Sequence, residues 1–209
     1  MECYEDETVV VAEGGDGCIN IAGGEITVSA GEDGVKATKD FAMSDGTLTI
    51  TKALDGIQTG DTIALSASEF YSVSGSVAID GGVINITSSE DGINTTEKFT
   101  MTAGDVTVNS EFDGIQTGEK LTALDIGTGT DDETALYSIN GTALISGGSI
   151  NVTAGGGHTG KTNQEIDYSC KGIKSNYLLK ITGGDITVDS LDDCIHSDNT
   201  PNTAVFSLS

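Results

Sequence analysis

The sequence predicts an all-β protein folded as a right-handed parallel β-helix, with three strands per turn of about 22 residues and about six to seven turns. Two observations support this prediction. A short motif recurs at a regular spacing, and segments that alternate apolar and polar residues surround each copy. The six copies are Asp33-Gly-Val, Asp55-Gly-Ile, Asp91-Gly-Ile, Asp113-Gly-Ile, Lys171-Gly-Ile and Asp193-Cys-Ile.

The spacing of the motif defines the repeat. Asp33 to Asp55, Asp91 to Asp113 and Lys171 to Asp193 are each 22 residues apart, and the longer intervals contain inserted sequence. A constant period of this size indicates a solenoid, in which each unit buries its apolar face by stacking on its neighbours. The Leu-rich pattern of leucine-rich repeats is absent.

Each unit contains three short alternating segments, and their apolar members are expected to point inward from strands. The first segment follows a glycine pair, the second begins at the motif, and the third precedes the next glycine pair. Examples of the three are Ile84/Ile86, Ile93/Thr95 and Phe99/Met101.

The chain of 209 residues is expected to form a single β-helix domain, residues 1–209, cut from a longer secreted protein. The segment 204–208 has the pattern of a third strand with none after it, which motivates that expectation; alternatively, this strand pairs with a partner. Insertions between the strands are expected near residues 61–76, 118–142 and 157–170.

The charge of the chain restricts its partners. A net charge of −24, with nine lysines and no arginine, argues against nucleic acid and against an acidic membrane surface. No segment approaches the apolar length of a membrane span. Residues 155–162 match a phosphate-binding loop, but no helix is expected to follow, so no nucleotide partner is predicted. The composition favours an extracellular or cell-surface location, although no signal peptide is visible.

The four cysteines, Cys3, Cys18, Cys170 and Cys194, match no zinc-binding spacing. Cys170 and Cys194 flank the acid position of the motif in adjacent turns. A disulfide between them and a pair of ordinary thiols are both compatible with the sequence.

The repeat places one acid per turn in a column with a spacing of about 4.8 Å. Two such carboxylates repel by about 3 kcal/mol at an effective dielectric constant of 20, which favours a bound cation. Oxygen ligands without His or Cys select calcium. Alternatively, each Asp caps its own turn, which leaves the adjacent acids unexplained. Lys171 is expected to replace the metal as a counter-ion in its turn. The candidate calcium ligands are Asp33, Asp55, Asp91, Asp113, Asp193, Glu32, Glu90 and Asp192.

The outward position of the second strand carries amide and cationic side chains beside the acids. These donors suit a hydroxyl-rich ligand, and a solvated face of stacked amides is the alternative. Tyr71 and Tyr137 occupy matching sites in two insertions, where each ring can stack on a sugar or anchor its own loop. The candidate carbohydrate-binding residues are therefore Gln58, Asn94, Gln116, Tyr71, Tyr137, Lys174 and His196.

The repeats also resemble a known family. The run GGxITVxSxxDGIxTxxxFTM and the segment DDCIHSDN are similar to the calcium-binding, carbohydrate-binding β-helix proteins of cellulolytic clostridia, over about residues 19–200. The resemblance implies extracellular, calcium-dependent binding of plant cell-wall polysaccharide, cellulose or pectin, on a polysaccharide-lyase-like fold. Lys171 and Cys194 depart from the motif and place metal binding in the last two turns in question.

We therefore expect a calcium-dependent polysaccharide-binding module rather than an enzyme. A pectate-lyase-like enzyme is the first alternative, with Lys36, Lys171 or Lys174 as the base. Such a base needs a lowered pKa, whereas neighbouring carboxylates raise it. A structural adhesin stalk is the second alternative.

Overall fold

The computed structural model describes residues 17–66, 69–122, 135–158 and 168–198. Within these ranges the chain is all-β and contains no helix, so none is long and apolar enough to cross a membrane. The strands are β1 (Ile19–Ser29), β2 (Val35–Ala37), β3 (Phe41–Lys52), β4 (Ile57–Thr59), β5 (Asp61–Ser66), β6 (Glu69–Val73), β7 (Ser76–Ser88), β8 (Ile93–Thr95), β9 (Lys98–Ser110), β10 (Ile115–Thr117), β11 (Glu119–Thr122), β12 (Ala135–Ile139), β13 (Thr142–Ile145), β14 (Ser149–Ala154), β15 (Ile173–Ser175), β16 (Leu178–Ile181), β17 (Asp185–Ser190) and β18 (Ile195–Ser197).

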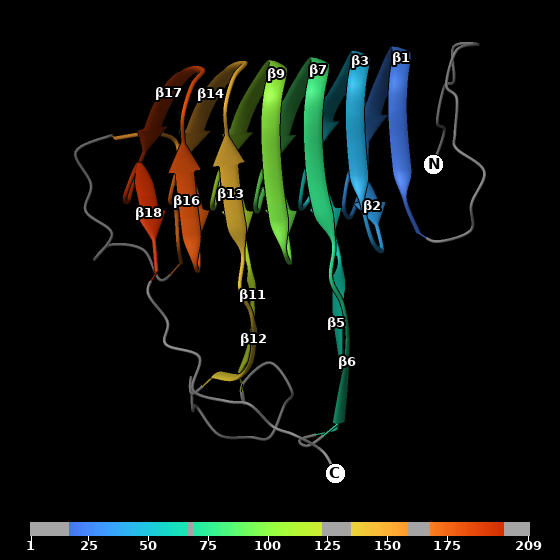
Figure 1. The fold of residues 1–209 in the computed structure, drawn as a ribbon, viewed down its shortest axis with the longest axis vertical. Coiled ribbons are helices and arrows are strands. Elements are labelled where there is room, and N and C mark those ends of the chain that lie inside the picture. The colour runs from blue at the N-terminus through green and yellow to red at the C-terminus, as the bar shows by residue number, and fades with distance from the viewer. Residues whose placement is uncertain (1–16, 67–68, 123–134, 159–167, 199–209) are drawn as a thin grey trace.

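Two parallel sheets contain most of these strands (Figure 1). The first runs in the order β1-β3-β7-β9-β13-β16, with β14 paired to β9 and β17. The second contains β2, β4, β8, β10, β15 and β18 in that order. The chain visits the two sheets alternately, and we call one passage through both sheets a rung. The predicted all-β class with parallel strands is confirmed.

Equivalent residues of successive rungs pair in the register that the repeat predicts. Leu48 pairs with Ile84 in the first sheet, and Ile57 pairs with Ile93 in the second. The alternation places the apolar members inside. Phe41, Phe99, Ile93 and other core side chains have essentially no exposed surface. A continuous core therefore runs through the stack.

The expected three separate strands per turn are modified in the first rungs. In β1, β3, β7 and β9 the third segment of one unit and the first segment of the next form one bent strand. The bend in β3 lies at Gly46, whose φ is +92°, and a Cβ there would lie 2.6 Å from a backbone carbon of Gly23. Glycine lets the chain change direction while its backbone stays close to that of the previous rung.

Two antiparallel hairpins interrupt the repeat. The hairpin β5–β6 and the hairpin β11–β12 extend from the same side of the stack in Figure 1. Each begins directly after a strand of the second sheet, β4 or β10. Both lie within segments of the sequence that were expected to be insertions.

The cysteines that the structure describes form no disulfide. Cys18, Cys170 and Cys194 are free thiols, and Cys3 lies outside the described residues. Cys170 is buried, and its thiol donates to the carbonyl of Glu111. The pKa of Cys170 is raised to about 11, mainly by burial and also by the charge of Asp113. Cys170 is therefore a protonated packing residue in this structure.

Candidate functional site

The motif acids occupy the bend between the two sheets, immediately before each strand of the second sheet. Asp113 is 1% exposed, and Asp55 and Asp91 are also buried. Asp33 is half-buried at one end of the stack, and Asp193 is exposed at the other. The column that the sequence predicts thus has a buried centre and more accessible ends.

Each buried acid bridges two rungs. Asp55 Oδ1 accepts a hydrogen bond from the backbone N–H of Asp91 at 3.0 Å, and Asp91 Oδ1 accepts from Asp113 N–H at 2.9 Å. Asp113 Oδ1 accepts from Lys171 N–H at 2.6 Å. The alternative in which each Asp caps its own turn is therefore wrong for these three residues. Their side chains satisfy the following rung, because stacking brings that N–H directly opposite.

The glycine after the acid is required by close approach between rungs. Gly56 lacks a positive φ, so turn geometry does not explain it. A Cβ at Gly56 would lie 2.3 Å from Ile86 Cγ2 and 2.4 Å from the carbonyl oxygen of Gly92. Equivalent clashes occur at Gly34, Gly92, Gly114 and Gly172.

Electrostatics divides the column into two parts. The pKa of Asp55 is raised to about 6, mainly by burial and also by the charge of Asp33, although the hydrogen bond from Asp91 N–H opposes the shift. Burial also raises the pKa of Asp91 well above its usual value, with contributions from Asp113 and Asp55. Ionisation of Asp55 and Asp91 is therefore costly.

Lysine side chains compensate the acids of the later rungs. Lys174 Nζ lies 2.9 Å from Asp113 Oδ2, and Lys171 Nζ lies 2.6 Å from Asp192 Oδ2. Burial opposes the charge of Lys171, but the hydrogen bond and charge of Asp192 raise its pKa overall. Burial likewise opposes ionisation of Asp192, yet Lys171 holds the pKa of Asp192 below its usual value. Lys171 therefore forms an ion pair with Asp192, and its expected replacement of a metal in this turn stays a prediction.

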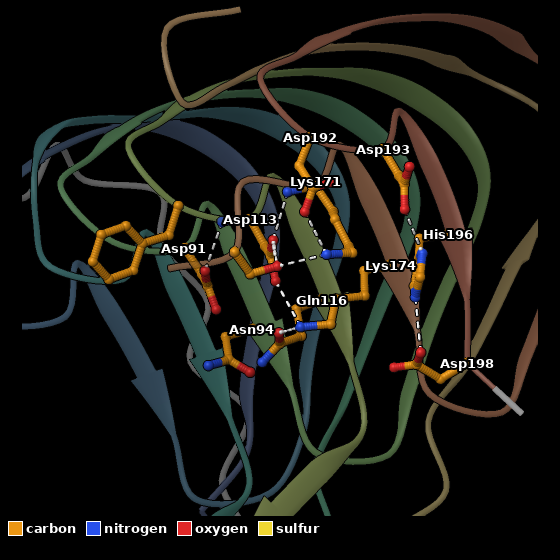
Figure 2. A network of polar contacts seen from close by, with 12 residues as sticks. Asp91, Asn94, Asp113, Gln116, Lys171, Lys174, Asp192, Asp193, His196 and Asp198 are labelled. Atoms are coloured by element: carbon orange, nitrogen blue, oxygen red, sulfur yellow. Dashed lines mark hydrogen bonds and ion pairs between the residues drawn. The ribbon is translucent and has the colours of Figure 1, made fainter. Parts of the chain in front are cut away.

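The outward residues of the second sheet form one aligned row, as the sequence predicts. The pairing register runs Lys36, Gln58, Asn94, Gln116, Lys174 and His196. We call these six residues the polar ladder. Several of its members contact the acid column, and Figure 2 shows part of this network.

The contacts of the polar ladder differ along its length. Asn94 Nδ2 donates to Asp55 Oδ2 at 3.3 Å, and Lys174 Nζ donates to Gln116 Oε1 at 2.7 Å. At the end of the ladder, His196 Nδ1 and Nε2 each lie 2.8 Å from a carboxylate oxygen, of Asp193 and Asp198 respectively (Figure 2). Lys36 forms a looser pair with Asp33 at 3.6 Å.

A hollow of about 230 Å³ opens on the later part of the polar ladder. Three of the predicted carbohydrate-binding residues, Asn94, Gln116 and Lys174, line it. Gln58 and His196 lie on the same ladder and do not line it. The sequence analysis missed its other lining residues, which are Thr117, Gly118, Asn176 and Asp198.

One wall of the hollow is held by Asn176. Its Oδ1 accepts a hydrogen bond from Gly141 N–H, and its Nδ2 donates to the carbonyl of Ile139 at 2.8 Å. Gly118, with a φ of +98°, makes room for this side chain, because a Cβ there would lie 2.0 Å from Asn176 Oδ1. The Gly that follows Ile-Gln-Thr and the Asn that follows Ile-Lys-Ser were the available sequence signals.

The predicted aromatic contacts lie mainly outside what the structure describes. The backbone places Tyr71 in β6 and Tyr137 in β12, but neither side chain is described. Tyr168, from the third insertion, packs on Phe112 with a ring-centroid distance of 4.5 Å and an interplanar angle of 35°. This tyrosine anchors its own loop to the stack.

The arrangement of the acidic side chains shows how well they could bind calcium. Among the described residues, no group of three or more His, Cys, Asp or Glu side chains is arranged to hold a metal ion. Asp91 Oδ2 nevertheless accepts no hydrogen bond from a described residue, in a carboxylate whose charge is costly. Glu90, which is half-buried, precedes it, whereas Glu32 is exposed near Asp33. The chemistry of these oxygens fits a hard cation.

In its described part, the segment 155–162, which matches a phosphate-binding loop in sequence, has no feature of a nucleotide-binding site. Residues 159–162 lie outside the described ranges. The preceding His158 Nδ1 lies 2.5 Å from Asp189 Oδ1, and this hydrogen bond raises the pKa of His158. His158 is thus a loop histidine paired with a carboxylate.

In the described part of the chain, fold and site together define a stack of parallel strands with a polar, hollowed face. Comparison with family models matches the chain to a family described as carbohydrate-binding domain-containing protein, over residues 5–114 and again over residues 71–205. The chain belongs to this family. No curated protein and no solved structure matches the chain.

Proposed function

We propose that the protein is a calcium-dependent, extracellular polysaccharide-binding module for plant cell-wall polysaccharide, with no catalytic activity of its own. The observation that carries the proposal is the hollow lined by Asn94, Gln116 and Lys174 on a face of parallel strands. Membership of a carbohydrate-binding family supports a sugar as the ligand. Amide and ammonium groups on rigid strands can orient sugar hydroxyls with little loss of side-chain freedom.

We further infer that the rungs coil as a right-handed parallel β-helix. Successive parallel strands of one sheet are joined by passages through the other sheet, and such crossover connections are right-handed in nearly all proteins. This architecture supports binding, because it holds the polar ladder as a flat row that a polymer can follow.

Calcium has a defined place in the proposal. The residues that would hold it are Asp91 and Asp55, with Glu90 as a further oxygen donor. When bound, calcium supplies positive charge to carboxylates that burial otherwise makes costly to ionise. The later rungs need no such cation, since Lys171 and Lys174 already balance the negative charges of Asp192 and Asp113.

The lysine chemistry argues against a lyase. The pKa of Lys171 is raised, so at neutral pH the side chain is held as an ammonium and little neutral amine is present to accept a proton. Lys174 Nζ is bound to Asp113 Oδ2 and Gln116 Oε1, which leaves it a hydrogen-bond donor. Lys36 lies at the far end of the polar ladder from the hollow, paired with Asp33.

Binding to insoluble cellulose and to pectin gels tests the proposal, with calcium present and with a chelator. We expect retention that the double substitution Asn94→Ala/Gln116→Ala lowers by at least tenfold. Asn151→Ala, an exposed amide on the first sheet, is the matched control and should bind normally. Retention equal to that of a solenoid without a polar ladder would favour a structural stalk. Formation of unsaturated product from polygalacturonate would favour a lyase.

A further inference from the structure

The hollow on the polar ladder contains both donors and acceptors that no described residue uses. Lys174 Nζ donates two hydrogen bonds within the protein, to Asp113 and Gln116, so a third N–H remains for a ligand. Gln116 uses its Oε1 as the acceptor from Lys174, which leaves its amide N–H groups available. Asn94 donates through Nδ2 to Asp55, which leaves its Oδ1 as an available acceptor.

Negative charge surrounds the one ammonium group of the hollow. Asp113 Oδ2 lies 2.9 Å from Lys174 Nζ, so a buried carboxylate already compensates the lysine. Asp198 also lines the hollow, with one carboxylate oxygen 2.8 Å from His196 Nε2. The whole chain carries a net charge of −24, which lowers the local concentration of anions.

These two observations together favour a neutral sugar over a uronate. A neutral sugar hydroxyl both donates and accepts, so two adjacent hydroxyls can use Lys174 or Gln116 as donors and Asn94 Oδ1 as an acceptor. A uronate residue also carries vicinal hydroxyls, but its additional carboxylate only accepts, and that carboxylate would be desolvated beside Asp198 and beside a lysine that is already paired. The hollow thus matches the hydrogen-bonding pattern of a vicinal diol.

We propose that this hollow binds the vicinal diol of a neutral sugar residue and rejects a uronate. The inference rests on the proposed function and assigns the class of sugar to one part of its surface. Anionic pectic chains would then bind elsewhere and through calcium, whereas neutral chains bind at the hollow without it.

Calorimetry on the full chain can separate the two ligand classes. The probes are a panel of neutral gluco-, manno- and galacto-oligosaccharides and an oligogalacturonate of the same length, each in chelator. We expect at least one neutral ligand to bind ten or more times more tightly than the oligogalacturonate. Its affinity should change by less than threefold between low and high salt, because a neutral ligand neutralises no charge.

Asp198→Asn gives a readout that a purely structural role would not produce. The amide keeps an acceptor oxygen and removes the negative charge, so oligogalacturonate affinity should rise at least threefold while neutral affinity stays within threefold. Gln116→Ala should lower neutral affinity about tenfold. Asn151→Ala, on the opposite sheet, should change neither affinity.

The outcomes distinguish this inference from the proposed function. Equal affinity for both ligand classes, or oligogalacturonate binding in chelator that Lys174→Met abolishes, overturns the neutral-diol assignment and leaves polysaccharide binding intact. Failure of the folded protein to bind any oligosaccharide or polymer, with calcium or without it, overturns the proposed function and the assignment together.

Discussion

Lys174 and Asp113 form an ion pair across two rungs, with Nζ 2.9 Å from Oδ2 and side-chain exposures of 21% and 2%. Lys36, at the same ladder position in the first rung, pairs instead with Asp33 of its own rung at 3.6 Å, and the two side chains are 47% and 17% exposed. The same ladder position therefore has two electrostatic settings, one enclosed and one solvated.

Removing the lysine should destabilise the protein at the enclosed pair far more than at the solvated pair. Lys174→Met leaves the carboxylate of Asp113 buried without its cation, which costs about 3–5 kcal/mol. Lys36→Met breaks a solvent-screened pair and should cost less than about 1 kcal/mol. Urea unfolding measures both values. Equal losses in the two variants would contradict the enclosed setting of Asp113, and the added substitution Asp113→Asn should restore part of the lost stability.

Adding a methyl group at the motif glycine should disrupt the stack. Gly56→Ala places a Cβ 2.3 Å from Ile86 Cγ2 and 2.4 Å from the Gly92 carbonyl, and we expect a loss of about 1–3 kcal/mol or more in the free energy of unfolding. Gly31→Ala is the control, since a Cβ there meets no atom within 4 Å and its φ is not positive. Matching stabilities for the two variants would show that the rungs are further apart at Gly56.

The sequence predicted the all-β class and the parallel pairing of the strands, because the repeat carries its own register. The period of 22 residues aligned Gln58, Asn94 and Gln116 correctly, and stacking requires that alignment. The hydrogen bonds from acid side chains to the next rung were not predictable, because they depend on the exact height between rungs. The pairing of Lys174 with Asp113 spans 61 residues and two insertions, which hide it from motif spacing.

The walls of the hollow were missed for a related reason. Asn176 occupies space that Gly118 leaves open, and this contact depends on where the β11–β12 hairpin leaves the stack. Asp198 lies at the hollow, where it hydrogen-bonds with His196, and strand pairing along the polar ladder fixes the position of His196. Sequence periodicity predicts which residues align, whereas the enclosed volume depends on the insertions between them.

Acidic conditions should stabilise the protein when a chelator removes calcium from the solution. Burial raises the pKa of Asp55 from an ordinary value of 3.8 to about 6, so the folded state binds a proton more tightly than the unfolded state. Stability is therefore greatest below pH 4 for this group and falls as the pH rises from about 4 to 6, by about 3 kcal/mol at most. Asp91, with its raised pKa, acts in the same direction.

Unfolding in urea at several pH values, in chelator, measures this effect. Asp55→Asn should flatten the profile between pH 4 and 6, and its Oδ1 can still accept from Asp91 N–H. Asp105→Asn, at an exposed site on β9, should keep the profile of the unmodified protein. An unchanged slope in the Asp55 variant would show that this carboxyl is not the titrating group.

Bound calcium should offset the cost of ionising Asp55 and Asp91 in the folded protein at neutral pH. A cation bound to ionised Asp91 and Asp55 in the folded state stabilises it by about 2.7 kcal/mol at a free concentration one hundred times Kd. Thermal melting at pH 7.5 should therefore show a higher Tm with calcium than with chelator. Asp91→Asn should shrink the shift, because it removes a carboxylate from the proposed site, whereas Asp105→Asn should retain it. A Tm that is insensitive to calcium in the unmodified protein would leave the acids as a proton-binding and hydrogen-bonding column, in which Lys174 compensates the buried charge of Asp113.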